Sequence, residues 1–285
     1  VIIMLVCLLF SGFGPVLGQS RRALLIGLGQ QADKGWARIH GDRDVYLMKP
    51  VLQKAGFWDV RMLVNSQATK QAIVKALTRL AGDCRAGDVV YVHFSGHGQL
   101  MTDREGDEED RWDECWIPYD ASLRYGQTDD GRLHLTDDEL NVLLLAVRKK
   151  VGPKGRILVV VDACHSGDST RGDEDEVFRG TSDRFVLPQE NAVAFVRKNP
   201  EEWITLSACR DYQRNAELKT QNGYYGKLTV AVCDALKQGT FQDNSQFYKH
   251  IRDFFDRHRG SLPQTPVMSG STSAFRISDV LNLKK

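Results

Sequence analysis

The sequence predicts an α/β fold in which a mainly parallel sheet is covered by helices on both faces. The order of the segments leads to this prediction. Short apolar runs, typical of buried strands, alternate with segments whose apolar residues recur at helical spacing. This alternation favours parallel strands, because parallel strands need a helical crossover between them. The 285 residues also contain no internal repeat and no linker-like stretch, so we expect one folded domain over residues 19–285.

The predicted elements follow one another in a regular order. Apolar runs predict the strands, at residues 23–28, 60–64, 88–94, 157–161 and 203–207. Helical spacing predicts the helices, at residues 44–55, 69–80, 136–150, 227–236 and 247–258. The third helix has a defined start, because Thr136 and Glu139 have the spacing of a capping box.

Composition and charge are those of an ordinary globular protein. Hydrophobic residues make up 42% of the chain and charged residues 26%, which excludes a disordered chain, a collagen-like repeat and a coiled coil. The 38 basic and 37 acidic residues leave a formal charge of +1. Because this charge is too small to attract phosphates over the whole surface, we expect no nucleic-acid partner.

The first 18 residues carry no charged side chain and have the layout of a secretory signal peptide. Residues 1–10 are almost continuously apolar, and glycine and proline interrupt the following residues. The basic segment that opens a signal peptide is missing, so we interpret residues 1–18 as a leader cut short at its start. A permanent membrane anchor is the alternative. We expect a mature chain that begins near Gln19, has no membrane span and is secreted or held in the periplasm or cell envelope.

Two predicted strands end in residues that carry chemistry. The third ends in Ser95-Gly-His97-Gly, and the fourth ends in Asp162-Ala-Cys164-His-Ser-Gly. In parallel sheets the reactive groups gather beyond the carboxyl ends of the strands. A cysteine thiolate is a nucleophile, and a nearby histidine can hold it in that state. Either residue alone is commonly a packed core residue, but both at equivalent strand ends indicate an active site.

These residues belong to a recognisable series of motifs. The series is ALLIGLG (23–29), GDRD (41–44), YVHFSGHG (91–98), DECWIPYD (113–120), LTDDEL (135–140), VVVDACHSG (159–167), LSAC (206–209) and GKLT (226–229). The chain resembles, over residues 22–277, the metacaspase-like branch of the caspase-fold cysteine peptidases. It departs from the apoptotic caspase signature Gln-Ala-Cys, because Asp162 replaces the glutamine and His97 precedes Cys164 by 67 residues. The resemblance implies a caspase-like three-layer αβα sandwich with a mainly parallel six-stranded sheet.

The resemblance implies a cysteine endopeptidase that needs no cofactor for its chemistry. Cys164 would attack the scissile carbonyl and His97 would protonate the leaving amine, while the N–H groups of Cys164 and Gly98 would bind the oxyanion. No third orienting residue is evident from the sequence. His165 is an alternative base, but successive residues of a strand face opposite ways, so we interpret it as a structural neighbour.

The predicted substrate pocket is acidic. Asp162 shares the pleat side of Cys164, and in the family an aspartate there joins Asp44 and Ser95 in a pocket for arginine or lysine. We therefore expect peptide and protein substrates with a basic P1 residue. Asp44 has a second interpretation, as a helix N-cap. Arg38 favours an acidic P1 residue instead, but such a residue would face Asp162.

An acidic run suggests calcium. Residues 103–114 contain eight carboxylates, and the default interpretation of such a run is a solvated loop. Several metacaspases require calcium, and the resemblance places its ligands at Asp113, Asp137 and Asp138, with Asp173 as a further ligand. Asp137 and Asp138 also lie in the first turn of a predicted helix, where acids are favoured in any case.

The segment 167–191 is long, polar and bears Arg171, Arg179 and Arg184. A basic-specific peptidase could cut itself there, and we predict self-processing in this segment. Two other functions stay open: a catalytically silent caspase-fold scaffold or regulatory module, and a peptidase of the same fold with an Asp or Asn preference. We expect a monomer.

Six cysteines are too few for a disulfide scaffold in a chain of this length. Cys7 falls in the predicted leader and Cys164 in the predicted active site. In an exported protein the remaining four permit up to two disulfides, although nothing in the sequence pairs them. These four are Cys84, Cys115, Cys209 and Cys233.

Overall fold

A six-stranded sheet forms the centre of the protein. The computed structural model describes residues 19–104, 106, 108, 110–165, 176–188 and 202–281, so the predicted leader lies outside the described residues. The strand order is β12-β9-β7-β3-β1-β2, and β12 is antiparallel to β9 while the other pairs are parallel. The strands are β1 (Arg21–Gly27), β2 (Asp59–Val64), β3 (Val89–Ser95), β7 (Arg156–Asp162), β9 (Ile204–Ser207) and β12 (Val267–Gly270). The predicted mainly parallel six-stranded sheet is confirmed.

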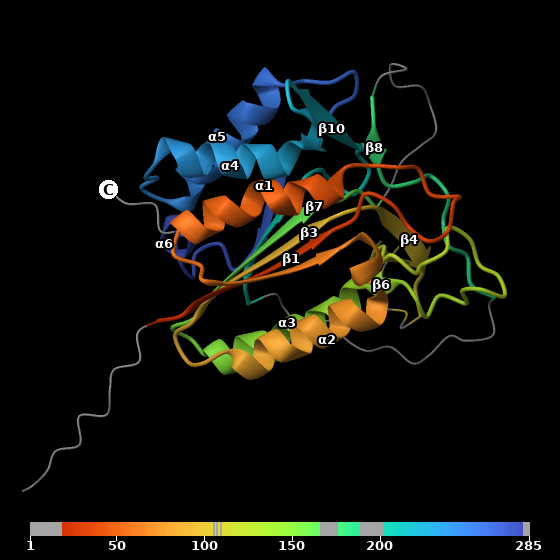
Figure 1. The fold of residues 1–285 in the computed structure, drawn as a ribbon, viewed down its shortest axis with the longest axis horizontal. Helices are drawn as coiled ribbons and strands as arrows, with labels where there is room; N and C mark the ends of the chain where they lie inside the picture. The colour runs from red at the N-terminus through yellow and green to blue at the C-terminus, as the bar shows by residue number, and fades with distance from the viewer. Residues whose placement is uncertain are drawn as a thin grey trace, which may run out of the picture.

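Helices cover both faces of this sheet (Figure 1). Helices α1, α4, α5 and α6 pack on one face, and α2 and α3 pack on the other. Their bounds are α1 (Gly41–Lys54), α2 (Lys70–Asp83), α3 (Asp137–Val151), α4 (Lys227–Gln238), α5 (Asn244–Arg257) and α6 (Ile277–Val280). All seven residues of β3 are buried, as expected for a central strand that meets helices on both sides.

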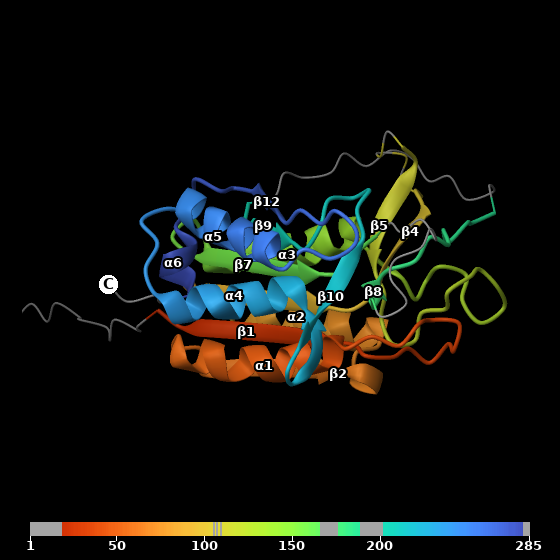
Figure 2. The ribbon, with the colours of Figure 1, turned by 90° about the horizontal axis from the view of Figure 1, so that it is seen from above.

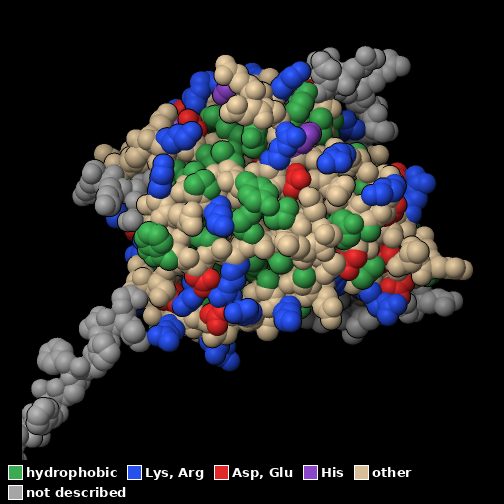
Figure 3. All heavy atoms as spheres, in the orientation of Figure 1, with side chains coloured by type: hydrophobic (Ala, Val, Ile, Leu, Met, Phe, Trp, Pro, Cys, Tyr) green, Lys and Arg blue, Asp and Glu red, His purple; other side chains and the backbone are tan. Residues whose placement is uncertain are grey.

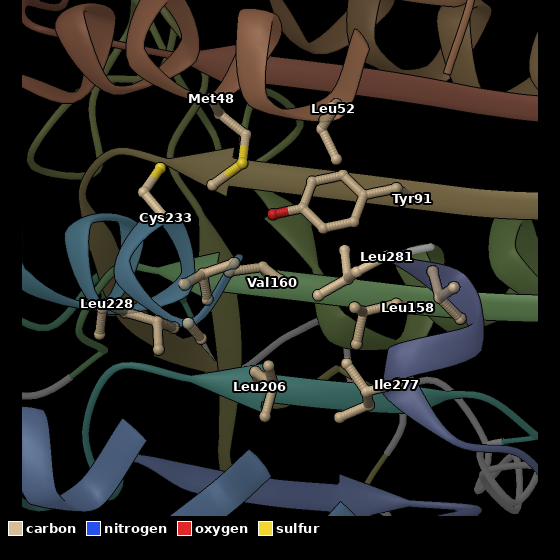
Figure 4. Packing of buried hydrophobic residues seen from close by; sticks show 14 of the residues in the cluster. Met48, Leu52, Tyr91, Leu158, Val160, Leu206, Leu228, Cys233, Ile277 and Leu281 are labelled. Carbon is tan, nitrogen blue, oxygen red and sulfur yellow. The ribbon is translucent and has the colours of Figure 1, made fainter. Parts of the chain in front are cut away.

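Two hydrophobic clusters fill the space between the layers. Figure 4 shows part of the cluster under α1, α4 and α6, where Met48 and Leu52 of α1 meet Tyr91 of β3. Leu158 and Val160 of β7 project into the same cluster, because alternate residues of a strand face one side of the sheet. This packing fixes the positions of β3 and β7, whose ends carry the predicted active-site residues.

The helix starts confirm one prediction and correct another. Thr136 caps α3, and its side chain and that of Glu139 form the predicted capping box. Helix α1 begins at Gly41, with His40 as its N-cap residue. Asp44 therefore lies inside the first turn of α1, and its interpretation as a helix N-cap is wrong. Its side chain is fully buried and bonds across to β3 instead of capping its own helix.

Two small sheets lie at the carboxyl end of the central strands (Figure 2). One contains β4 (Gly98–Thr102), β5 (Trp112–Trp116) and β6 (Leu135–Thr136), and the other contains β8 (Phe178–Arg179), β10 (Asn215–Thr220) and β11 (Gly223–Gly226). The sequence did not predict these strands, because they are short and lack a continuous apolar run.

The visible face carries charges of both signs. In Figure 3 basic side chains are spread over this face, and the sparser acidic side chains lie mostly over its lower part. Among the described residues, the helices are all too short or too polar to cross a bilayer. The five described cysteines, at positions 84, 115, 164, 209 and 233, are buried and none of them forms a disulfide, so the structure contains neither of the disulfides that the count permitted among these residues.

Candidate active site

The two chemistry-bearing segments leave the sheet from neighbouring strands. Strands β3 and β7 pair in parallel, and their last residues, Ser95 and Asp162, are register partners. His97 follows two residues after the end of β3, and Cys164 follows two residues after the end of β7. The parallel pairing therefore brings both segments to the same edge of the sheet, as the sequence predicted.

His97 is held by two backbone groups. Its Nε2 atom lies 2.8 Å from the carbonyl oxygen of Ala37, and its Nδ1 atom accepts a hydrogen bond of 2.9 Å from the N–H of Gly180. The ring centroid of Trp36 lies 5.0 Å away. Burial lowers the pKa of His97 to about 4. The imidazole is therefore neutral near pH 7, and its Nδ1 lone pair is free of a proton when Nε2–H donates to Ala37.

Cys164 lies beneath the same segment. Its side chain is buried, and Sγ donates to the carbonyl oxygen of Gln213 over 2.8 Å. The backbone of Gly98 passes directly beside it, since a Cβ on Gly98 would lie 2.6 Å from the Cys164 carbonyl oxygen. Cys209 is a second neighbour, and its pKa is raised by a hydrogen bond with Cys164 and by burial. Only glycine at position 98 allows the backbones of residues 98 and 164 to lie this close together.

A pocket of carboxylates next to Cys164 is filled by a side chain of the protein itself. The guanidinium of Arg179 is fully buried and lies 2.8 Å from Asp44 Oδ2, 3.5 Å from Asp162 Oδ1 and 3.0 Å from Glu217 Oε1. It also donates to Ser95 Oγ and to the backbone carbonyl of Asp162. The three predicted pocket residues thus meet around one cation.

The carboxylates of this pocket have different pKa shifts. Burial raises the pKa of Asp44 to about 6, although Arg179 opposes the shift. Burial would also raise the pKa of Asp162, but Arg179 and hydrogen bonds from Asn215 and Thr229 outweigh it and bring that pKa below its usual value. Asp162 is therefore the carboxylate that stays ionised most readily in this pocket. Asp44, by contrast, needs the charge of Arg179 to stay ionised.

The segment around Arg179 lies across the site as an added strand. Strand β8 pairs with β10 in an antiparallel manner, with Arg179 opposite Asn215, and the N–H of Glu217 donates to the carbonyl of Val177. Gly180 has a φ of +124°, and a Cβ there would meet the carbonyl oxygen of Cys164. The peptide bond between Arg179 and Gly180 is thus held between the carboxylate pocket, His97 and Cys164.

Other predicted residues lie elsewhere. Nδ1 of His165 is 3.4 Å from Oε2 of Glu114, so that ring is directed toward β5. Arg38 is exposed, in contrast to the buried carboxylates. The guanidinium of Arg184 stacks 4.4 Å above the ring of Trp112. Asp173 and Arg171 lie outside the described residues.

Three of the four predicted calcium ligands come together. Carboxylate oxygens of Asp113, Asp137 and Asp138 lie within 4.8 Å of one another. Asp113 is on β5, and the other two begin α3. Hard oxygen donors at this spacing suit a divalent cation of the calcium type.

Sequence reasoning missed several groups at the site. Ala37 and Gln213 act through backbone carbonyls, which leave no mark on residue type. Glu217 and Asn215 both reach the pocket, Asn215 through a bond of 2.8 Å to Asp162 Oδ1. The alternation Asn-Ala-Glu at 215–217 is the period-2 pattern of a strand with one polar face. That alternation is the sequence signal from which Asn215 and Glu217 could have been predicted to lie on one face of a strand.

Comparisons with known proteins agree with this architecture. A model of the caspase domain matches residues 20–276. The chain is 32% identical over 292 residues to metacaspase-1 of Emericella nidulans, covering 86% of this chain and 69% of that relative. A solved structure of a Geobacter sulfurreducens protein has a TM-score of 0.63 at 24% identity and covers 90% of this chain and 97% of that one. Caspase-1 of Spodoptera frugiperda has a TM-score of 0.59 at 13% identity, with coverages of 88% and 87%. Since the caspase-domain match takes in nearly the whole chain, this protein belongs to the caspase-domain family of cysteine endopeptidases, in its metacaspase-like branch.

Proposed function

We propose that this peptidase cleaves on the carboxyl side of arginine and lysine and that its first substrate is its own Arg179–Gly180 bond. One observation carries the proposal: the Arg179 side chain fills the carboxylate pocket while the N–H of the next residue, Gly180, donates to Nδ1 of His97. In a peptidase, the residue in the specificity pocket is P1, and the following nitrogen belongs to the leaving group. This arrangement is that of a substrate, held in cis.

The charge of the pocket supports a basic P1 residue. Asp44, Asp162 and Glu217 surround the Arg179 guanidinium at ion-pair distance. Two guanidinium nitrogens also bond one oxygen of Glu217, at 3.1 and 3.0 Å. An acidic P1 side chain would add a further buried anion to this group, which is strongly unfavourable.

Arginine should be preferred over lysine. The planar guanidinium reaches Ser95, the Asp162 carbonyl and two carboxylates at once, and a lysine ammonium has only three donors at one point. Lysine would keep the charge attraction and lose part of this bonding, so we expect cleavage after lysine at a lower rate.

The proposed chemistry uses the dyad of Cys164 and His97. Nδ1 of His97 takes the thiol proton, the thiolate attacks the P1 carbonyl carbon, and the same proton is passed to the leaving nitrogen as the peptide bond breaks. Water then hydrolyses the thioester. The hydrogen bond between Nε2 and the Ala37 carbonyl supports this assignment, because it fixes the tautomer in which Nδ1 is free to accept. The N–H groups of Gly98 and Cys164 are the proposed oxyanion donors.

We also propose that calcium binds to Asp113, Asp137 and Asp138. Three carboxylates within 4.8 Å of one another repel each other, and a bound divalent cation neutralises that repulsion without taking part in bond cleavage. The site is connected to the catalytic region, since the residue after Asp113 is Glu114, whose Oε2 atom lies 3.4 Å from Nδ1 of His165. Calcium is therefore proposed as an activator, and the bond cleavage itself needs no cofactor.

The decisive experiment follows the chain over time on a gel and by mass spectrometry. Wild type is expected to yield a fragment that begins at Gly180, and Cys164→Ala is expected to stay intact. Arg179→Ala should lose this cleavage, whereas the matched control Arg184→Ala should keep it, because Arg184 stacks on Trp112 outside the pocket.

A second assay tests the specificity on external substrates. Fluorogenic peptides that end in Arg, Lys, Asn or Asp are offered to the processed enzyme, with and without calcium. We expect the peptide that ends in Arg to be hydrolysed fastest, the Lys peptide more slowly, and the Asp peptide not at all. Equal fragmentation of wild type and Cys164→Ala would overturn the self-cleavage proposal, and preference for Asp or Asn would overturn the specificity.

A further inference from the structure

The segment that follows the proposed scissile bond is also held by main-chain hydrogen bonds. Residue 185 adds as a parallel partner to β4: the N–H of Phe185 donates to the Leu100 carbonyl at 2.9 Å, and the N–H of Thr102 donates to the Phe185 carbonyl at 3.0 Å. Further along, the N–H of Leu187 donates to Thr102 Oγ1. Main-chain bonds of this kind recognise any extended peptide, whatever its side chains.

A buried side chain also bonds the backbone of this segment, two residues before Phe185. The side chain of Gln99 is fully buried, and its Nε2 atom donates to the carbonyl of Asp183 at 2.8 Å. The Oε1 atom of Gln99 bonds Nε2 of His134 at 2.9 Å, and Nδ1 of His134 lies 3.3 Å from Oδ2 of Asp129. This chain of buried polar groups holds the Gln99 amide in one orientation, with its N–H toward the bound segment.

One side chain of the segment enters an apolar pocket. Phe185 is fully buried and packs among Trp36, Met101, Cys115 and Ile117. Its ring centroid lies 4.2 Å from that of His134. These four residues come from the segment before α1, from β4 and from β5 with its following residue. The pocket is therefore built mainly by other parts of the chain, and Leu187 of the held segment packs into the same cluster.

The neighbouring side chains add little specificity. The pair of Asp183 and Arg124 is exposed and contributes little binding in water. Val186 is exposed. Phe185, fully buried, is therefore the most deeply buried side chain of this region, with the buried Leu187 beside it in the same cluster. Phe185 is the sixth residue after the proposed scissile bond.

We propose that the pocket around Phe185, together with β4 and Gln99, is an exosite for peptides that carry a bulky aromatic residue six positions after the cleaved arginine. The inference rests on the proposed cleavage after Arg179, and it narrows the substrate class. In the uncut chain the exosite holds the Arg179–Gly180 bond in register. After the cut, the same segment stays tethered through Phe185 and competes with the primed side of other substrates.

The test uses two synthetic peptides with the sequence of residues 176–188, one natural and one with Phe185→Ala. Both are offered to processed enzyme that itself carries Phe185→Ala, so that its own exosite is vacant. Rates are divided by the rate on a short fluorogenic arginine amide that ends at the scissile bond, which removes any general loss of activity. We expect kcat/KM for the natural peptide to exceed that for the alanine peptide by about tenfold or more, as burial of an aromatic ring predicts.

Wild-type enzyme provides the matched comparison, because its own Phe185 occupies the exosite, and it should discriminate less between the two peptides. If the alanine enzyme does not fold, Phe185→Leu replaces it, with a smaller preference expected. Equal kcat/KM for the two peptides in the vacant enzyme overturns the exosite.

A binding assay keeps this result separate from the proposed specificity. Labelled peptides of residues 181–188, with and without Phe185→Ala, are titrated into protein carrying Cys164→Ala and Phe185→Ala. These peptides lack Arg179, so binding that depends on the phenylalanine supports the exosite even when the short arginine amide is not cleaved. Equal binding of the two peptides refutes it.

Discussion

The backbone N–H of Gly180 donates a hydrogen bond of 2.9 Å to Nδ1 of His97. Since Arg179 fills the carboxylate pocket on the other side of the same peptide bond, the protein holds one of its own bonds in the position that we propose for a substrate. The same contact blocks the site, because an external arginine cannot enter the pocket while Arg179 is there. Under the proposed function, one segment is both the first substrate and an inhibitor, and its cleavage is the proposed route to an open pocket.

Replacing Gly180 tests how closely the segment must approach Cys164. Gly180 has a φ of +124°, and a Cβ would meet the Cys164 carbonyl oxygen. We expect Gly180→Ala to slow self-cleavage roughly tenfold or more, since such backbone strain costs about 1–3 kcal/mol. The rate of fragment formation measures this. Ser182→Ala, at an exposed neighbouring position, is the control and should cleave at the wild-type rate. Equal rates for the two variants would show that the approach is looser than the geometry indicates.

Removing the Arg179 charge should destabilise the uncut protein. In a Cys164→Ala background, Arg179→Ala leaves Asp44, Asp162 and Glu217 buried without their shared cation. Loss of one partner of a buried ion pair costs about 3–5 kcal/mol, so we expect a fall of this order in the free energy of unfolding, measured with urea. Arg184→Ala removes an exposed guanidinium from an aromatic ring and should cost about 1 kcal/mol or less. A loss no larger for Arg179→Ala than for Arg184→Ala contradicts the prediction.

Much of the fold was predictable because its signals are local. The apolar run of residues 88–94 and the periodic spacing of residues 69–80 are visible within one element, and β3 and α2 formed there. The start of α1 was misjudged by three residues, and this error supported the N-cap interpretation of Asp44. The N-cap is one particular residue, defined by its backbone geometry. An error of a few residues in the predicted start of a helix therefore assigns the cap to the wrong side chain.

The site was only partly predictable because its remaining parts depend on long-range pairing. The three arginines of the 167–191 segment looked equivalent in sequence, and it is the pairing of β8 with β10 that places Arg179 beside the buried carboxylates. Glu217 reaches the pocket through the same pairing. Ala37 orients His97 through a carbonyl oxygen that every residue type possesses. Neither periodicity nor composition contains this information.

The buried imidazole of His97 should make the fold sensitive to acid. Its pKa is about 4 in the folded protein against 6.5 for the free group, so between these values the unfolded chain holds the proton and the folded chain does not. Stability is therefore complete above about pH 6.5 and falls as the pH drops toward 4, by on the order of 3 kcal/mol for this group. His93, whose pKa is also lowered by burial, acts in the same direction. Asp44, with its raised pKa, acts in the opposite direction.

A difference between variants isolates the His97 contribution. Urea unfolding of Cys164→Ala and of Cys164→Ala with His97→Gln is compared at pH 7, 5.5 and 4.5, and the second protein should lose less stability on acidification. His258→Gln, at an exposed histidine, is the control and should leave the pH dependence unchanged. If the free energy of unfolding falls equally with pH in the His97 variant and in its parent, the pKa of His97 is not lowered in the folded protein.

Calcium should stabilise the protein through Asp113, and the effect can be measured without catalysis. In Cys164→Ala protein, a ligand at one hundred times its Kd adds about 2.7 kcal/mol of stability, which for a chain of this size raises Tm by roughly 5–10 °C. Asp113→Asn should abolish this shift, because it removes one charge from a group of three carboxylates within 4.8 Å. Asp110→Asn lies in the same acidic run, where its carboxylate accepts from the Trp112 N–H, and should retain the shift. Magnesium should act more weakly, since it gives up its water reluctantly. A calcium shift of equal size in both variants, or no shift in the parent, would falsify the proposed ligands and leave the acidic run as a solvated loop.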